Sequence, residues 1–253
     1  VVTPAPTTGP TPAPSVPPTP QPIALPETTV ARRRVRCGFN GGDPHIVTLD
    51  GLLYDCHGRG EFFLTKVDST QGEVQVRFEP WSTDPSGPFT VTTAMAASEE
   101  GSSVVQVSLA ASGSALEILV DGATYDNSNT GTGVTLRETS SGVDIEFPSG
   151  MEVIVTFNNA MLTVDVDLPP DVESTGLLGN NNDDAEDDWM TQGGGSIEVP
   201  GNPTEAEGTN YCTTNWCTTE STSIFTYRPV RLRFRVCRRG GRQADAAGTT
   251  VLR

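Results

Sequence analysis

The sequence predicts an all-β fold, namely an antiparallel β-sandwich, and three observations support this prediction. From residue 43 to about residue 168, apolar and polar residues alternate with a period of two over short runs. Gly, Ser, Asn and Pro, which favour turns, separate these runs. No stretch of helical length in this region repeats its apolar residues every 3.6 positions. Half-buried antiparallel hairpins of this kind are the units of a sandwich.

The predicted strands follow one another between turn residues. Short turn sequences connect neighbouring strands at 112–114 (SGS), 148–150 (PSG) and 158–159 (NN). In the last strand Asp165 and Asp167 alternate with apolar residues, so we expect both to face water. The predicted strands are, in chain order, 73–78, 105–109, 116–120, 143–147, 153–157 and 162–168.

The two ends of the chain have compositions that differ from the middle. Residues 1–29 are mostly Pro, Thr and small residues, which cannot bury a core and favour extended polyproline II. The basic residues that follow, 32–36, are interpreted as a solvated run of charges. We predict a disordered Pro/Thr-rich N-terminal stalk over 1–36, either an O-glycosylated mucin-like spacer or an unmodified linker. A β domain with a C-terminal cysteine segment follows over 37–227, and 228–253 is an Arg-rich tail that is disordered or non-native.

The charge of the chain is strongly acidic and unevenly distributed. The net charge is −16, and eight of the sixteen basic residues lie in 228–253, so residues 1–227 carry −23. Such a surface repels nucleic acid and anionic membranes. No apolar run approaches the roughly 18 residues of a membrane-spanning helix. We therefore expect cations and other proteins as partners, with no nucleic acid and no membrane span in this sequence.

The cysteines indicate an oxidising compartment. There are five, four of them in the acidic part, and none has the CxxC spacing of a metal site. Disulfide bonds are therefore expected, and the protein is predicted to be secreted or to lie on the extracellular face of the cell surface. The two histidines, His45 and His57, are too few for a histidine-based metal site.

An acidic segment over 180–188 is the strongest candidate for a metal site. Two carboxylates about 4 Å apart repel by roughly 4 kcal/mol at an effective dielectric constant near 20. A calcium ion with six to eight oxygen ligands removes that repulsion. An EF-hand is excluded because Ala185 stands where that loop needs glycine; a solvated acidic loop is the alternative. Oxygen-bearing side chains occur at Asn180, Asn182, Asp183, Asp184, Glu186, Asp187 and Asp188.

Two separated motifs, 42–54 (GDPHIVTLDGLLY) and 176–188 (GLLGNNNDDAEDD), together resemble the von Willebrand factor type D domain, over roughly 37–217. The resemblance implies a β-sandwich in which the opening motif and the late loop share a calcium ion. Gly51 and Gly179 are then expected to form the tight turns. The ligands that the resemblance implies are Asp50, Asn180 and Asn182 by side chain, Asp184 by its backbone carbonyl, and Asp187 and Asp188 by side chain.

The sequence departs from the family pattern at two cysteine positions, where Gly60 and Leu178 stand. Because the usual pairing is lost, we expect Cys56 to bond to Cys212 or Cys217, with Cys37 taking the other and Cys237 unpaired. The four cysteines allow three pairings, and the sequence does not choose among them. In some mucins of this family the bond corresponding to Asp43-Pro44 cleaves itself; here we expect a structural turn.

The expected function is that of a non-enzymatic structural or adhesive module of the extracellular matrix or cell coat, with other extracellular proteins or glycoproteins as partners. The sequence contains no HExxH, no GxSxG and no phosphate-binding glycine loop, which argues against a hydrolase. The alternative is a calcium-dependent ligand- or carbohydrate-binding receptor. Its support comes from aromatic residues expected to be exposed, which are Trp81, Trp189 and Trp216.

Overall fold

A computed structural model describes most of the β domain. The residues described are 1–2, 34–38, 44–81, 85–110, 112–113, 115–128, 130–158, 160–169 and 172–226, with the backbone alone for 34–38. Most of the predicted stalk, Asp43 and the predicted tail lie outside them. Contacts divide the chain into Val1–Ala31 and Arg32–Arg253, and everything below concerns the second unit. In the described part of the chain, no helix is long and apolar enough to span a bilayer.

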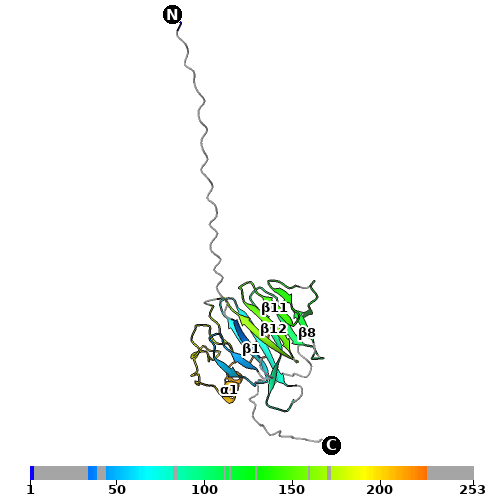
Figure 1. Ribbon diagram of the computed structural model, residues 1–253, viewed down its shortest axis with the longest axis vertical. Helices are drawn as coiled ribbons and strands as arrows, with labels where there is room; N and C mark the ends of the chain where they lie inside the picture. The colour runs from blue at the N-terminus through cyan, green and yellow to red at the C-terminus, as the bar shows by residue number, and fades with distance from the viewer. Residues whose placement is uncertain are drawn as a thin grey trace. The chain divides into compact units, whose positions relative to one another are not determined.

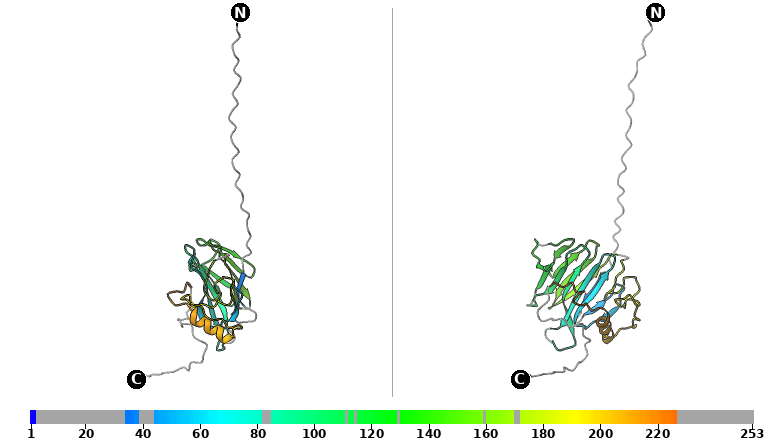
Figure 2. Two further views of the ribbon diagram at one scale, coloured as in Figure 1. Left: turned by 90° about the vertical axis from the view of Figure 1, so that its left-hand side faces the viewer. Right: turned by 180° about the vertical axis from the view of Figure 1, so that it is seen from behind.

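The described residues form two antiparallel sheets and one helix, α1 (Glu205–Asn215). One sheet has the strand order β10-β11-β12-β13-β1-β2-β3, and the other contains β4 to β9 in chain order. Figure 1 shows β1, β12 and β11 in one sheet, and Figure 2 gives the same arrangement from the side and from behind. The strands are β1 (Arg34–Gly38), β2 (His45–Val47), β3 (Leu53–Asp55), β4 (Gly60–Val67), β5 (Gly72–Pro80), β6 (Thr90–Ser98), β7 (Val105–Leu109), β8 (Leu116–Val120), β9 (Ala123–Thr124), β10 (Thr135–Glu138), β11 (Gly142–Glu146), β12 (Glu152–Asn158) and β13 (Met161–Asp167). The all-β, antiparallel prediction is confirmed.

One hydrophobic core lies between the sheets. In β5, Val74, Val76 and Phe78 point into it, as the period of two requires. Leu177 and Leu178, just before the acidic loop, belong to the same core and are fully buried. Burying each leucine stabilises the fold by about 1.5–3 kcal/mol. The segment leading into the candidate metal site is thus anchored in the core.

The expectation that Asp165 and Asp167 face water is wrong. They are 7 % and 3 % exposed. The reason is that β13 is an interior strand: β12 flanks one side and β1 the other, with Arg36 and Arg34 opposite the two aspartates in register. Residues 34–36 of the basic run, which we interpreted as solvated, thus lie in an interior strand, β1.

Helix α1 was not predicted, because its buried positions do not form a long apolar stripe. It begins with a capping box: the Thr204 hydroxyl accepts from the Glu207 N–H at 3.3 Å, and the Glu207 carboxylate accepts from the Thr204 N–H at 2.8 Å. Its buried face contains Gly208, where a Cβ would lie 2.3 Å from the Asp55 carbonyl oxygen. Glycine at this position therefore allows α1 to pack closely against β3.

Candidate metal centre

The two motifs that are far apart in sequence lie side by side. The turn between β2 and β3 donates the Leu49 N–H to the Leu178 carbonyl at 2.8 Å. Thr48 Oγ1 donates to Asp188 Oδ2 at 2.5 Å, across 140 residues of chain. The Tyr54 hydroxyl donates to the Leu177 carbonyl at 2.7 Å. These bonds place Asp50, at the tip of the turn, next to the acidic loop.

Asp50 holds the first half of this loop. Its two carboxylate oxygens accept the backbone N–H groups of Asn182 at 3.0 Å and Asp183 at 2.9 Å. Asn181 and Asp183 have φ of +60° and +69°, left-handed values that asparagine and aspartate tolerate better than most residues. The loop therefore curls around the Asp50 carboxylate.

Asp188 is the buried carboxylate of the site, with no exposed surface. It accepts from the Asn180 N–H at 3.2 Å as well as from Thr48. Burial, together with the nearby Asp50 carboxylate, raises the pKa of Asp188 to about 6. A carboxyl whose pKa is raised on folding stabilises the fold only while it is protonated, and that stability is lost as pH rises through the folded pKa. At neutral pH the ionised Asp188 carboxylate therefore opposes folding unless a cation neutralises it.

The asparagines provide neutral oxygens beside this pair. Asn180 Nδ2 donates to Asp187 Oδ1 at 2.7 Å, and Asn182 Nδ2 donates to both Asp187 oxygens at 3.2 and 3.0 Å. The Asn180 Oδ1 atom is buried and accepts no hydrogen bond. A buried acceptor without a donor costs about 1–3 kcal/mol. A cluster of carboxylate and amide groups with one unsatisfied buried oxygen fits a hard cation such as calcium.

Asp184 is placed differently from the other five predicted ligands. Its side chain is exposed and accepts the Glu186 N–H at 3.0 Å, and its carbonyl accepts the Asp187 N–H at 3.5 Å. Across the described residues, no three Asp, Glu, His or Cys side chains form a ready metal cluster. A cation bound here would therefore need oxygens of asparagine and the backbone in addition to those of Asp50, Asp187 and Asp188.

An aromatic cluster lies beneath the loop. The Trp189 ring stacks on Tyr211 with centroids 4.5 Å apart, and Tyr54 meets both rings edge-on at 5.6 Å. Trp189 thus packs under the site. Trp189 and Trp216 are 4 % and 1 % exposed, so the expectation that they are exposed is wrong. Both rings are covered because α1 packs over this end of the sandwich.

Tyr211 is a site residue that sequence reasoning missed. Its hydroxyl accepts the Met190 N–H at 3.2 Å and Trp216 Nε1–H at 2.8 Å, and donates to the Asp188 carbonyl at 3.5 Å. Burial raises the pKa of Tyr211. This hydroxyl fixes the backbone on both sides of Trp189. The only sequence signal for it is its position one residue before Cys212.

Tyr211→Phe is expected to lower the free energy of unfolding by about 1–3 kcal/mol, because the buried Trp216 Nε1–H and the part-buried Met190 N–H lose their acceptor. Urea unfolding measures the change. Tyr125→Phe is the matched control, since the Tyr125 hydroxyl donates to Asn127 on the surface. Equal stabilities of the two variants would show that the Tyr211 hydroxyl does not hold the loop.

A disulfide closes this end of the domain. Cys56, just after β3, is bonded to Cys212 in α1 with an S–S distance of 2.04 Å. This confirms the first of the two expected partners of Cys56. Cys217 is also disulfide-bonded. Its predicted pairing with Cys37 concerns a side chain outside those that the structure describes, and it stays a prediction.

His45, of the GDPH segment, begins β2 and faces Asp55 of β3. Its Nδ1 lies 2.5 Å from Asp55 Oδ1, and the two residues are cross-strand partners. Pro44 is buried, and its carbonyl accepts the Cys56 N–H at 3.1 Å. The described half of this segment therefore joins β2 to the chain around the disulfide, while Asp43 lies outside the described residues.

Two antiparallel sheets, closed at one end by an acidic loop, a helix and a disulfide, define a disulfide-bonded β-sandwich module. A family model of the von Willebrand factor type D domain matches residues 39–195. The chain belongs to this family.

Three curated proteins are similar in sequence to this chain. Human Sushi domain-containing protein 2 is 32 % identical over 197 residues, which is 74 % of this chain and 23 % of that protein. Human Mucin-4 is 32 % identical over 180 residues, 65 % of this chain and 3 % of that protein. Protein mesh from Bombyx mori is 30 % identical over 174 residues, 60 % of this chain and 11 % of that protein. The aligned region thus covers less than a quarter of each relative.

Proposed function

We propose that this chain is a non-enzymatic extracellular protein-interaction module, structural or adhesive, in which calcium and disulfides stabilise the fold. The observation that carries the calcium proposal is the buried, unsatisfied Asn180 Oδ1 beside the buried Asp188 carboxylate. The proposed ligands are Asp50, Asn180, Asn182, Asp187 and Asp188 by side chain and Asp184 by its carbonyl. Bound calcium supplies positive charge to a cluster that is otherwise self-repelling.

The chain's own residues determine what ion binding does to the fold. Asp50 comes from the β2–β3 turn, whereas the other proposed ligands come from a loop 130 or more residues later. Holding these two segments together restricts the unfolded chain and preserves the contacts of Thr48 and Tyr211. The role proposed for the ion is therefore structural: it holds the β2–β3 turn against the acidic loop at one end of the sandwich.

Extracellular location and a binding role are supported by independent features. The Cys56–Cys212 bond fits an oxidising compartment. Mucin-4 is among the relatives, which favours other extracellular proteins or glycoproteins as partners. A non-enzymatic role is supported by the chemistry of the site, whose groups are carboxylates and amides engaged in loop hydrogen bonds. The carbohydrate-receptor alternative loses its main support, because Trp189 and Trp216 are covered.

The test is thermal unfolding with calcium and with a chelator. Extracellular calcium modules bind with a Kd of about 10⁻⁴–10⁻³ M. At a calcium concentration about 100 times Kd, binding adds about 2.7 kcal/mol, which raises Tm by about 5–10 °C in a domain of this size. Asp50→Asn is expected to abolish the rise. Glu186→Gln, which removes one exposed charge from the same loop, is expected to keep it.

Two outcomes would contradict the proposal. An unchanged Tm at saturating calcium, or a full rise in Asp50→Asn, would remove the shared site. If Tm stayed constant while the protein bound glycans only in the presence of calcium, the receptor function would be favoured instead.

A further inference from the structure

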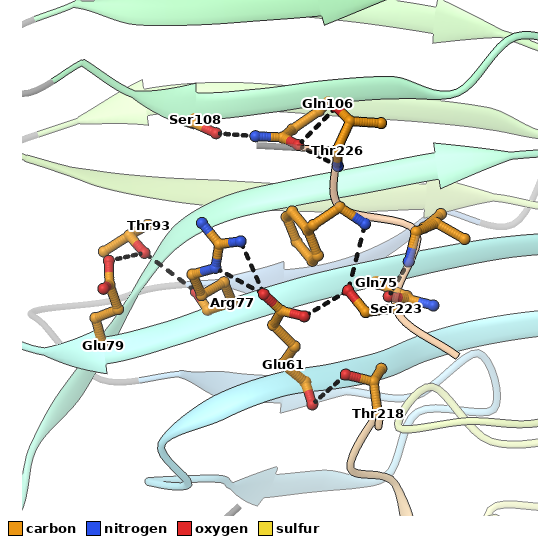
Figure 3. Close-up of polar contacts among 12 residues, drawn as sticks. Glu61, Gln75, Arg77, Glu79, Thr93, Gln106, Ser108, Thr218, Ser223 and Thr226 are labelled. Carbon is orange, nitrogen blue, oxygen red and sulfur yellow. Dashed lines mark hydrogen bonds and ion pairs between the residues drawn. The ribbon is translucent and has the colours of Figure 1, made fainter. Parts of the chain in front are cut away.

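The segment after α1 crosses the outer face of the six-stranded sheet. Residues 218–226 form this strap. Gln75, Arg77 and Gln106 alternate with core residues of β5 and β7 and therefore point away from the core, yet they are 0 %, 3 % and 1 % exposed. Polar side chains on an outer face are normally solvated. They are buried here because the strap covers them, as Figure 3 shows for Gln75, Gln106 and the labelled strap residues.

The glutamines bind the strap through its backbone. Gln75 Nε2 donates to the Thr222 carbonyl at 2.7 Å, and Gln75 Oε1 accepts the Ile224 N–H at 3.1 Å. Gln106 Oε1 accepts the Thr226 N–H at 3.1 Å. Gln106 Nε2 donates to Ser108 at 3.0 Å, which keeps its oxygen turned towards the strap. The sheet therefore recognises an extended backbone at residues two apart.

A row of small residues makes room for this backbone. Register places Ala96 between Gln75 and Gln106 across β5, β6 and β7. Ala94 and Ala96 form a small apolar cluster with Phe225, which is 5 % exposed. The Arg77 guanidinium lies 4.3 Å from the centroid of the Phe225 ring. One aromatic side chain thus anchors the strap in an apolar and cationic site.

An ion pair connects this anchor to Ser223, two residues earlier in the strap. Arg77 Nη2 donates to Glu61 Oε1 at 2.8 Å, and Glu61 Oε2 accepts from Ser223 Oγ at 2.6 Å. Figure 3 shows these side chains in one chain of contacts from β5 to the strap. The surface of Glu61, Gln75, Arg77, Ala94, Ala96 and Gln106 is the seat of the strap. The seat selects a serine and an aromatic residue two positions apart on an extended peptide.

The geometry points to a peptide-binding site on the outer face of the sheet, whose ligand is the strap of a second copy of this chain in exchange with the chain's own strap. Every copy carries both the seat and the strap. Residues 219–222 of the strap are exposed and form the hinge, so the strap can swing out without disturbing the core between the sheets. Phe225 then leaves its cluster with Ala94 and Ala96, and the seat of a second copy restores that contact. Exchange between two copies reproduces each seat contact, which is the condition for swapped dimers. This inference does not depend on calcium.

Complementary full-length variants test the exchange. Phe225→Ala weakens the strap and keeps the seat, whereas the double variant Gln75→Ala/Gln106→Ala weakens the seat and keeps the strap. When the two variants are mixed, we expect a heterodimer whose Kd is at least tenfold lower than the Kd for self-association of either variant. Analytical sedimentation measures these constants. Phe89→Ala replaces a partly exposed phenylalanine outside the strap and serves as the control in place of Phe225→Ala. It is expected to pair at least tenfold more weakly than Phe225→Ala does, because its own strap competes for its seat.

A peptide-binding experiment tests the same site if the double variant does not fold. A labelled peptide of residues 218–226 is titrated into full-length Phe225→Ala, and saturable 1:1 binding is expected. The same peptide carrying Phe225→Ala is expected to bind at least tenfold more weakly. No peptide binding, equal binding by both peptides, or no heterodimer from two cooperatively folded variants would each overturn the inference.

Discussion

Replacing both Cys56 and Cys212 by serine is expected to lower the free energy of unfolding by about 2–5 kcal/mol. The bond joins residues 156 positions apart, so cutting it releases a long loop in the unfolded chain. It also joins the end of β3 to α1, which carries Tyr211 under the acidic loop. We therefore expect the double variant to need a higher calcium concentration for the same Tm. Urea unfolding with and without calcium measures both effects.

Cys237→Ser is the matched control for the disulfide experiment. If Cys217 is bonded to Cys37, as predicted, Cys237 is unpaired and its replacement leaves the urea midpoint unchanged. Peptide mapping of the unreduced protein identifies the partner of Cys217 directly. An unchanged midpoint in the Cys56/Cys212 variant would show that this bond does not stabilise the fold.

Gly179→Ala is expected to be the most damaging single substitution in the acidic loop, costing about 3 kcal/mol or more. Gly179 has φ of +77°, where alanine is strained by about 1–2 kcal/mol. An added Cβ would also lie 1.9 Å from Asp188 Oδ1. Asp188 cannot easily move away, because Thr48 and the Asn180 N–H hold its carboxylate. The substitution is therefore expected to weaken calcium binding as well.

Gly51→Ala measures the cost of backbone strain without the steric clash that Gly179→Ala introduces. Gly51 has φ of +97°, but nothing lies within 4 Å of a Cβ built there. Its replacement is expected to cost about 1–2 kcal/mol from strain alone. Denaturant unfolding of both variants gives the difference. Equal costs at the two glycines would mean that the loop does not close tightly over Asp188.

The strands were predictable where alternation is regular and local. Residues 105–109 and 116–120 coincide with β7 and β8, and 73–78 lie within β5. Strand β1 was missed, because it begins within the basic run 32–36, whose four arginines among five residues are typical of a solvated segment. Its place beside β13 depends on long-range pairing, and that pairing buries Asp165 and Asp167.

The candidate site was predictable as two motifs, but its supporting contacts were not. The motifs determine which oxygens are available, and the structure places Asp50 against the loop. The roles of Thr48 and Tyr211 depend on how the β2–β3 turn and α1 pack, which no local pattern reveals. Similarly, alternation in β5 places Gln75 and Arg77 on the outer face, but it does not indicate that a segment about 150 residues later covers them.

The most direct test of the shared ion site is a crystal structure grown in millimolar calcium, with the ion located by its anomalous scattering. The site is expected to hold one ion, with oxygens of Asp50, Asn180 and Asp188 about 2.3–2.6 Å away. An ion bound elsewhere, or an Asp50 carboxylate turned away from Asp188 with no ion between them, would contradict the account.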